Sequence, residues 1–133
     1  MDTDTLVENL VGDGQRLVDE LLRGGFAVAA AFWLKASEDC KWNFYIVSPI
    51  VDSEGLTKAY RQLHPLVRRM PEPFRIDPLE IKLIGPINPI ARDVAAILGR
   101  FSGTSQSPIL WGGKQLGSMS IEDAYLYPLP TAP

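Results

Sequence analysis

The spacing of the hydrophobic residues changes from a helical to a strand period near residue 26. Between residues 6 and 22 they recur at helical spacing and occupy an arc of about 160° on a helical wheel. This predicts an amphipathic helix that begins at Thr5 and stops at Gly24-Gly25. Gly14 lies near the middle of the arc, and two interpretations stay open, a close approach to a sheet and a kink at Gly12 to Gly14.

Two strands are predicted next. Residues 26–34 are hydrophobic on both alternating faces, which is typical of a central strand that is covered above and below. A polar break at residues 37–39 follows, and residues 42–47 read as the returning arm of a hairpin.

A second helix is expected from Asp52 or Ser53, as N-cap, to about Arg69. Its hydrophobic residues occupy one side, while the opposite side is basic. Pro65 removes one amide of the helix, so a kink or break is expected near His64. The second helix therefore has one core face and one basic face.

The rest of the chain alternates short strands with one helix. Residues 78–84 have the period of a half-buried strand, and Asn88 with Pro89 begins a third helix. Gly112-Gly113 suits a tight turn between two short strands, and a last strand covers residues 120–127. The proline-rich residues 128–133 are predicted to be a disordered tail.

The order of the predicted elements is α-β-β-α-β-α-β-β-β. A hairpin at one end and a group of strands at the other favour an α+β fold, with a mixed, mainly antiparallel sheet and about three helices packed on it. With 133 residues, of which 46% are hydrophobic and 22% charged, the chain fits a single domain over residues 1–127.

Composition limits the possible functions. The net charge of -3 argues against a protein that binds nucleic acid or an acidic membrane over its whole surface. Cys40 is the single cysteine and His64 the single histidine, so neither a disulfide nor a Cys/His zinc site is expected. The acidic first residues and the lack of a run of about 18 hydrophobic residues predict a cytoplasmic protein without a membrane partner.

Carboxylates give one enzymatic alternative. Asp77, Glu80 and Lys82 resemble the acid, acid-x-lysine set of metal-dependent nucleases, but Asp77 is too close in sequence to Glu80. The alternative is a small hydrolase or nuclease that uses Asp77, Glu80 or Asp123. No metal, cofactor or catalytic residue is predicted.

The last strand offers a possible binding surface. Asp123, Tyr125 and Tyr127 share one face because side chains alternate along a strand. If that face is open, the three residues line a polar binding surface. The commoner arrangement is amphipathic packing in which the hydroxyl groups reach the boundary of the core.

The basic face of the second helix is a second candidate. Between Ser53 and Arg75 the two acids Glu54 and Glu72 are outnumbered by five basic residues, an excess of three: Lys58, Arg61, Arg68, Arg69 and Arg75. Such a face fits an anionic partner, either nucleic acid or an acidic protein. A solvated helix face is the commoner explanation.

Several segments together resemble a group of small bacterial proteins that have no assigned function. They are the strand ending Ala30-Ala31-Phe32-Trp33, Ser48-Pro49 after the next strand, Gly55 followed by Tyr60, and residues 121–127. The similarity spans most of the chain. It implies no activity, cofactor or site residue.

The leading hypothesis is a non-catalytic cytoplasmic module that associates with a protein partner or with itself. It rests on the absence of a recognisable catalytic set and on the many aromatic residues in the strands, which favour an exposed apolar patch. Binding of an anionic partner and hydrolysis are the two alternatives.

Overall fold

The computed structural model describes residues 8–38, 41–72, 74–100, 109–116 and 119–127, with the backbone alone for residues 8–9, 98–100, 109–116, 119 and 122–123. The start of the first helix at Thr5, Cys40 and the tail 128–133 lie outside this part. The elements are α1 (Glu8–Arg23), β1 (Ala30–Ala36), β2 (Trp42–Val47), α2 (Pro49–Glu54), α3 (Leu56–Arg68), the 3₁₀ turn η1 (Pro78–Glu80), β3 (Ile81–Ile84), α4 (Pro89–Arg100), β4 (Ile109–Leu116) and β5 (Met119–Leu126).

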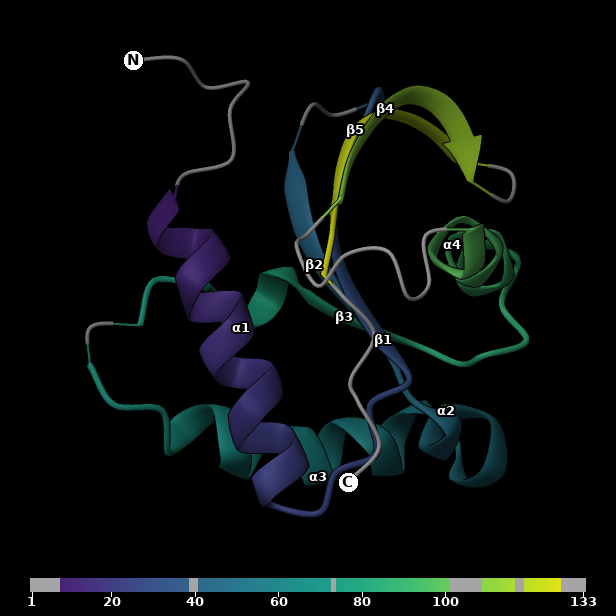
Figure 1. The fold of residues 1–133 in the computed structure, drawn as a ribbon. Helices are drawn as coiled ribbons and strands as arrows, with labels where there is room; N and C mark the ends of the chain where they lie inside the picture. The colour runs from purple at the N-terminus through teal and green to yellow at the C-terminus, as the bar shows by residue number, and fades with distance from the viewer. Residues whose placement is uncertain (1–7, 39–40, 73, 101–108, 117–118, 128–133) are drawn as a thin grey trace.

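The five strands form one mixed sheet in the order β3-β2-β1-β5-β4. β2 and β3 are parallel, and the other neighbouring pairs are antiparallel. Helices α1 and α3 lie on one face of the sheet and α4 on the other (Figure 1). The structure thus confirms the α+β class and the central position of the first predicted strand.

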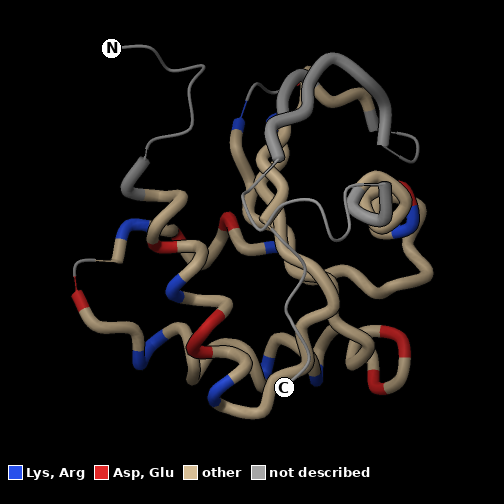
Figure 2. The backbone as a smooth tube through the Cα atoms, in the orientation of Figure 1, with Lys and Arg blue, Asp and Glu red and all other residues tan. Residues whose placement is uncertain are grey.

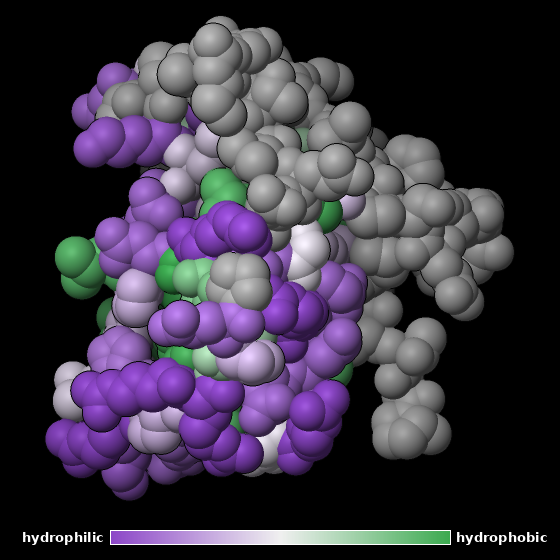
Figure 3. Space-filling view, turned by 90° about the vertical axis from the view of Figure 1, so that its left-hand side faces the viewer, coloured by the Kyte–Doolittle hydropathy of each residue, from purple (hydrophilic) through white to green (hydrophobic). Residues whose placement is uncertain are grey.

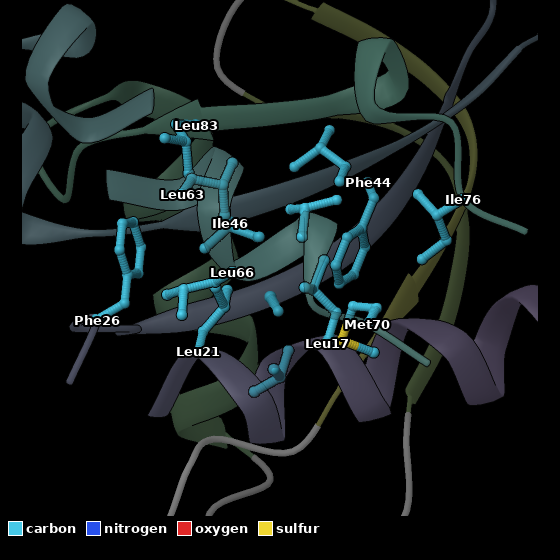
Figure 4. Close-up of a cluster of buried hydrophobic side chains, with 14 of the residues drawn as sticks. Leu17, Leu21, Phe26, Phe44, Ile46, Leu63, Leu66, Met70, Ile76 and Leu83 are labelled. Atoms are coloured by element: carbon cyan, nitrogen blue, oxygen red, sulfur yellow. The ribbon is translucent and has the colours of Figure 1, made fainter. Parts of the chain in front are cut away.

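β1 separates two hydrophobic layers because its side chains alternate between the faces. Ala31 and Trp33 join the layer under α1 and α3, while Phe32 and Leu34 join the layer under α4. Figure 4 shows how the first layer fills with side chains from both helices and the sheet, among them Leu21 and Leu66. A strand that is buried on both faces explains the unbroken hydrophobic run.

The first strand begins later than its hydrophobic run because Phe26 completes the end of α1. The Phe26 N–H donates to the Leu21 carbonyl at 2.8 Å, and the Gly25 N–H donates to the Leu22 carbonyl at 3.2 Å. Gly25 has φ +82°, as this pair of helix-ending hydrogen bonds requires. The predicted stop at Gly24-Gly25 is therefore confirmed, and β1 starts only at Ala30.

The expected second helix is two helices, and its break lies elsewhere than predicted. α2 ends and α3 begins at Gly55, whose φ of +93° interrupts the helical path. Pro65 lies inside α3, so the helix does not break near His64, while the kink that was expected there as the alternative stays a prediction. The N-cap of α2 is Ser48, whose Oγ accepts the Ile50 N–H, rather than Asp52 or Ser53.

Two strand predictions are also corrected. Residues 78–80 form η1, so β3 starts at Ile81 instead of Pro78. Gly112 and Gly113 lie inside β4 rather than in a turn, and Gly112 pairs with Asp123 of β5. The two short strands expected on either side of the glycines are consequently one strand of eight residues.

Gly14 gives α1 a close contact with the sheet. A Cβ at this position would overlap the Tyr127 hydroxyl and would lie 3.2 Å from the Trp33 Nε1. Of the two interpretations left open, close approach is confirmed, because α1 continues as one helix through Gly12 and Gly14.

Candidate functional site

The tyrosine face of β5 is covered at Tyr127. Tyr127 is only 3% exposed; its hydroxyl donates to the Val11 carbonyl at 2.6 Å and accepts the Trp33 Nε1–H at 3.0 Å. Burial raises the pKa of Tyr127 well above its ordinary value, although the hydrogen bond from Trp33 lowers it. Tyr127 thus anchors α1, which is the amphipathic packing that was expected from the sequence as the commoner arrangement.

The other two residues predicted on that face are less constrained. Tyr125 is half-buried and packs edge-on against Tyr127, with ring centroids 5.3 Å apart. Burial raises the pKa of its hydroxyl as well. Asp123 pairs with Lys35 and Gly112 in the sheet, but its side chain lies outside the described residues.

The basic face of α3 divides into paired and unpaired residues. Lys58 forms an ion pair with Glu54 at 3.4 Å, and Arg69 forms one with Glu20 of α1 at 3.4 Å. Arg61 and Arg68 are exposed and have no ion pair within the described residues. Figure 2 shows the basic residues along α3 and the acidic residues of the neighbouring α1.

Of the carboxylates predicted for hydrolysis, Asp77 has a structural role. The Asp77 carboxylate accepts the Leu79 N–H at 2.9 Å and so caps η1. Across the described ranges there is no group of three His, Cys, Asp or Glu side chains that could hold a metal ion. His64 is exposed and lies beside Tyr60, with ring centroids 5.8 Å apart. The hydrolase alternative stays a prediction, since the Asp123 carboxylate is not described.

A surface that the sequence did not indicate lies along β3. We define the β3 margin as Leu79, Lys82 and Ile87, which are all exposed. Leu79 is 82% exposed and Ile87 is 73% exposed, more than the other large hydrophobic residues whose side chains are described. Figure 3 views the molecule from the side of α1, and hydrophilic residues cover most of its coloured surface. The β3 margin is therefore apolar at both ends and positively charged in the middle.

Local hydrogen bonds hold both ends of the β3 margin in place. Besides the cap from Asp77 to Leu79, the Ile87 N–H donates to the Asp52 carboxylate of α2 at 3.2 Å. The Asn88 N–H closes the same turn on the Gly85 carbonyl at 3.0 Å. The two hydrophobic residues consequently project from ordered backbone.

Strand β3 itself is protected against pairing with a further strand. In a strand the N–H and C=O of one residue point to the same side, and those of the next residue point to the opposite side. The Ile84 carbonyl accepts the Ser48 N–H at 2.9 Å, so the backbone groups of Ile84 point toward β2. The Ile81 and Leu83 N–H groups therefore point outward. The first donates to the Pro78 carbonyl and the second to the Tyr60 hydroxyl at 3.0 Å. A partner at this edge has to be held by side chains.

Sequence reasoning missed the β3 margin because it extended the strand period too far. Leu79 alternates with Ile81 and Leu83, which suggested that all three side chains point to the core. η1 breaks that alternation and leaves Leu79 exposed. The signal that could have indicated this was Asp77-Pro78, a helix N-cap followed by proline at the first helical position.

Comparison of the chain with protein-family models, with curated proteins and with solved structures finds no match. The resemblance to small bacterial proteins thus stays a prediction. Among the described helices, none has both the length and the hydrophobicity needed to cross a membrane.

Proposed function

We propose that the protein is a non-catalytic interaction module of the cytoplasm that binds another protein through the β3 margin. The observation that carries this proposal is the exposure of Leu79 and Ile87 on either side of Lys82. Complete burial of a leucine or isoleucine side chain contributes about 1.5–3 kcal/mol. Because the backbone of both residues is already hydrogen-bonded, little ordering is required when a partner covers them.

Lys82 favours a partner of a different kind over a second copy of the chain. If two copies met edge to edge across a two-fold axis near the middle of β3, their Lys82 residues would be close together, and like charges at short distance repel. A partner that presents a carboxylate between two apolar contacts complements the margin instead. Such a pairing improves specificity and the rate of association.

Site-specific photo-cross-linking in the producing cell tests this proposal. A photoreactive amino acid at position 79 is expected to give a discrete adduct of higher mass, while the same group at the exposed position Ala95 of α4 gives none. Lys82→Glu in the position-79 protein should reduce the adduct at least tenfold, because it reverses the charge that faces the partner. Equal adducts from both positions, or an adduct that Lys82→Glu leaves unchanged, would contradict the proposal.

A second candidate function is binding of a polyanion through α3. The specific observation in its favour is that Arg61 and Arg68 are exposed and unpaired within the described residues, whereas Lys58 and Arg69 have acidic neighbours. We expect Arg61→Glu/Arg68→Glu to abolish retention of DNA or RNA at about 50 mM salt, where electrostatic binding is strong. Lys58→Glu/Arg69→Glu is the matched control of equal charge change and should have the smaller effect. No retention of the unaltered protein would exclude this candidate.

A further inference from the structure

The two edge strands of the sheet, β3 and β4, differ in their length and in the partners of their outward backbone groups. The β3 edge is four residues long, its outward N–H groups are already bonded, and Lys82 is exposed on it. The β4 edge is eight residues long and pairs with β5 on one side, with no strand on its other side in the part of the chain described. β4 contains no proline, and its single charged residue is Lys114. A long strand of this kind at an edge is a template for a further strand.

We propose that β4 pairs antiparallel with β4 of a second copy of the chain, so that two sheets join into one of ten strands. The two-fold axis stands normal to the sheet and midway between the paired strands. The proposal concerns the edge opposite the β3 margin in the strand order, and it does not rest on the proposed function. A dimer of this form leaves both β3 margins at its far ends.

Symmetry restricts the register of such a pair. Directly opposite residues of an antiparallel pair share a face, so the residue on the axis faces its own counterpart. With Gly112 on the axis, Trp111 comes opposite Gly113 of the second copy, and Leu110 comes opposite Lys114. An aromatic residue opposite a strand glycine is a stabilising cross-strand pair. Lys114 does not face Lys114, so the register brings no like charges directly opposite one another.

This register also explains why a second copy is a better occupant than an unrelated extended peptide. In the self-pairing the Trp111 of each strand comes opposite Gly113 of the other, so the stabilising pair occurs twice because the interface is symmetric. The overlap covers residues 109–115 of both chains. An unrelated peptide gains the backbone hydrogen bonds alone unless its sequence matches these positions.

Light scattering combined with hydrogen exchange provides the first test. We expect a dimer at micromolar concentration, and slower amide exchange in β4 in the dimer than after dilution to monomer, because strand pairing protects its outward N–H groups. A monomer at every concentration would overturn the proposal. So would a dimer whose dissociation leaves exchange in β4 unchanged, since its interface would then lie elsewhere.

Cysteine cross-linking tests the register itself in the Cys40→Ser background. Directly opposite Cα atoms lie about 4.5–5.5 Å apart, which suits a disulfide. Gly112→Cys is therefore expected to form a disulfide-linked dimer on mild oxidation, at a yield at least tenfold above that of Ala95→Cys on α4. Equal yields from the two variants would contradict pairing through β4.

Two substitutions of Leu110 complete the test, because both place a charged side chain at the same position and only the sign of the charge differs. Leu110→Lys places lysine opposite Lys114 twice and should raise the dimer dissociation constant at least tenfold. Leu110→Glu places opposite charges there and should leave the dissociation constant unchanged or lower it. Equal responses of the two variants would overturn the assigned register.

Discussion

Hydrophobic residues are arranged in opposite ways in two regions of the molecule. They are buried where α1 contacts the sheet and exposed in the β3 margin. In α1, Leu17 and Leu21 are completely buried, and the helix is fixed further by the hydroxyl of Tyr127. In the β3 margin, polar groups hold the backbone while Leu79 and Ile87 remain exposed. The difference indicates that the hydrophobic residues of the first region stabilise the fold, whereas those of the second contribute little to the core and stay exposed to solvent.

One polar residue of α1, Asp13, strengthens this contrast because it is buried as well. Asp13 is only 3% exposed, accepts the Arg75 N–H at 2.7 Å and pairs with the Arg16 guanidinium. It thereby links α1 to the loop before η1. A buried carboxylate of this kind is satisfied by its neighbours.

The largest effect is expected where α1 loses buried surface. Leu21→Ala should lower the free energy of unfolding by about 2–5 kcal/mol, because it removes a fully buried side chain from the layer in Figure 4. Leu22→Ala is the matched control on the same helix, since Leu22 is 43% exposed. Urea denaturation measures both. Similar losses for the two variants would show that α1 is not docked as described.

A smaller loss is expected at Gly14. Gly14→Ala adds a Cβ that overlaps the Tyr127 hydroxyl and lies 3.1 Å from its Cζ; overpacking of this kind costs about 1–3 kcal/mol, and helix propensity returns about 1 kcal/mol. Gly12→Ala is the control, because nothing lies within 4 Å of its added Cβ. It should stabilise the protein. If Gly14→Ala does so too, the close approach to Tyr127 is wrong.

Alkaline pH should weaken the same contact. The pKa of Tyr127 is raised in the folded protein, mainly by burial, while the unfolded chain ionises near pH 10. Above that pH the unfolded state binds fewer protons than the folded state, so stability falls by about 1.4 kcal/mol per pH unit. Tyr127→Phe should make the decline from pH 9.5 to 11 shallower, with Tyr125 still contributing. Denaturation curves at these pH values measure the slopes, and an equal decline in Tyr127→Phe would contradict the role of burial.

The sequence was sufficient for the α+β class and the centre of the sheet, because a strand buried on both faces has an unmistakable pattern in Ala30–Ala36. The sequence was insufficient where the course of the chain depends on the backbone conformation of a single residue. Gly55 and Gly112 are the same residue type, yet the first has φ +93° and divides two helices, while the second lies within an extended strand. Local sequence does not distinguish the two uses.

The surroundings of the candidate site residues could not be predicted either, because they depend on contacts with other segments of the chain. The position of Tyr127 in the core depends on α1, which is more than a hundred residues away in sequence, so alternation within β5 could not reveal which face is covered. The neighbours of Lys58 and Arg69 differ in the same sense: Glu54, at the end of α2, is four residues from Lys58 in sequence, but Glu20 of α1 is 49 residues from Arg69. Contacts between distant segments set the function of a surface, and a single sequence does not contain their geometry.

The smallest effect on stability is expected at Leu79, and it tests whether the hydrophobic residues of the β3 margin are independent of the core. Leu79→Ala should change the free energy of unfolding by less than about 0.5 kcal/mol, because the side chain is 82% exposed and the N–H that Asp77 caps is unaffected. Urea denaturation measures this against Leu21→Ala, the same substitution at a buried site. A loss above about 1 kcal/mol would mean that Leu79 stabilises the fold, and the β3 margin would then lose its best candidate contact for a partner.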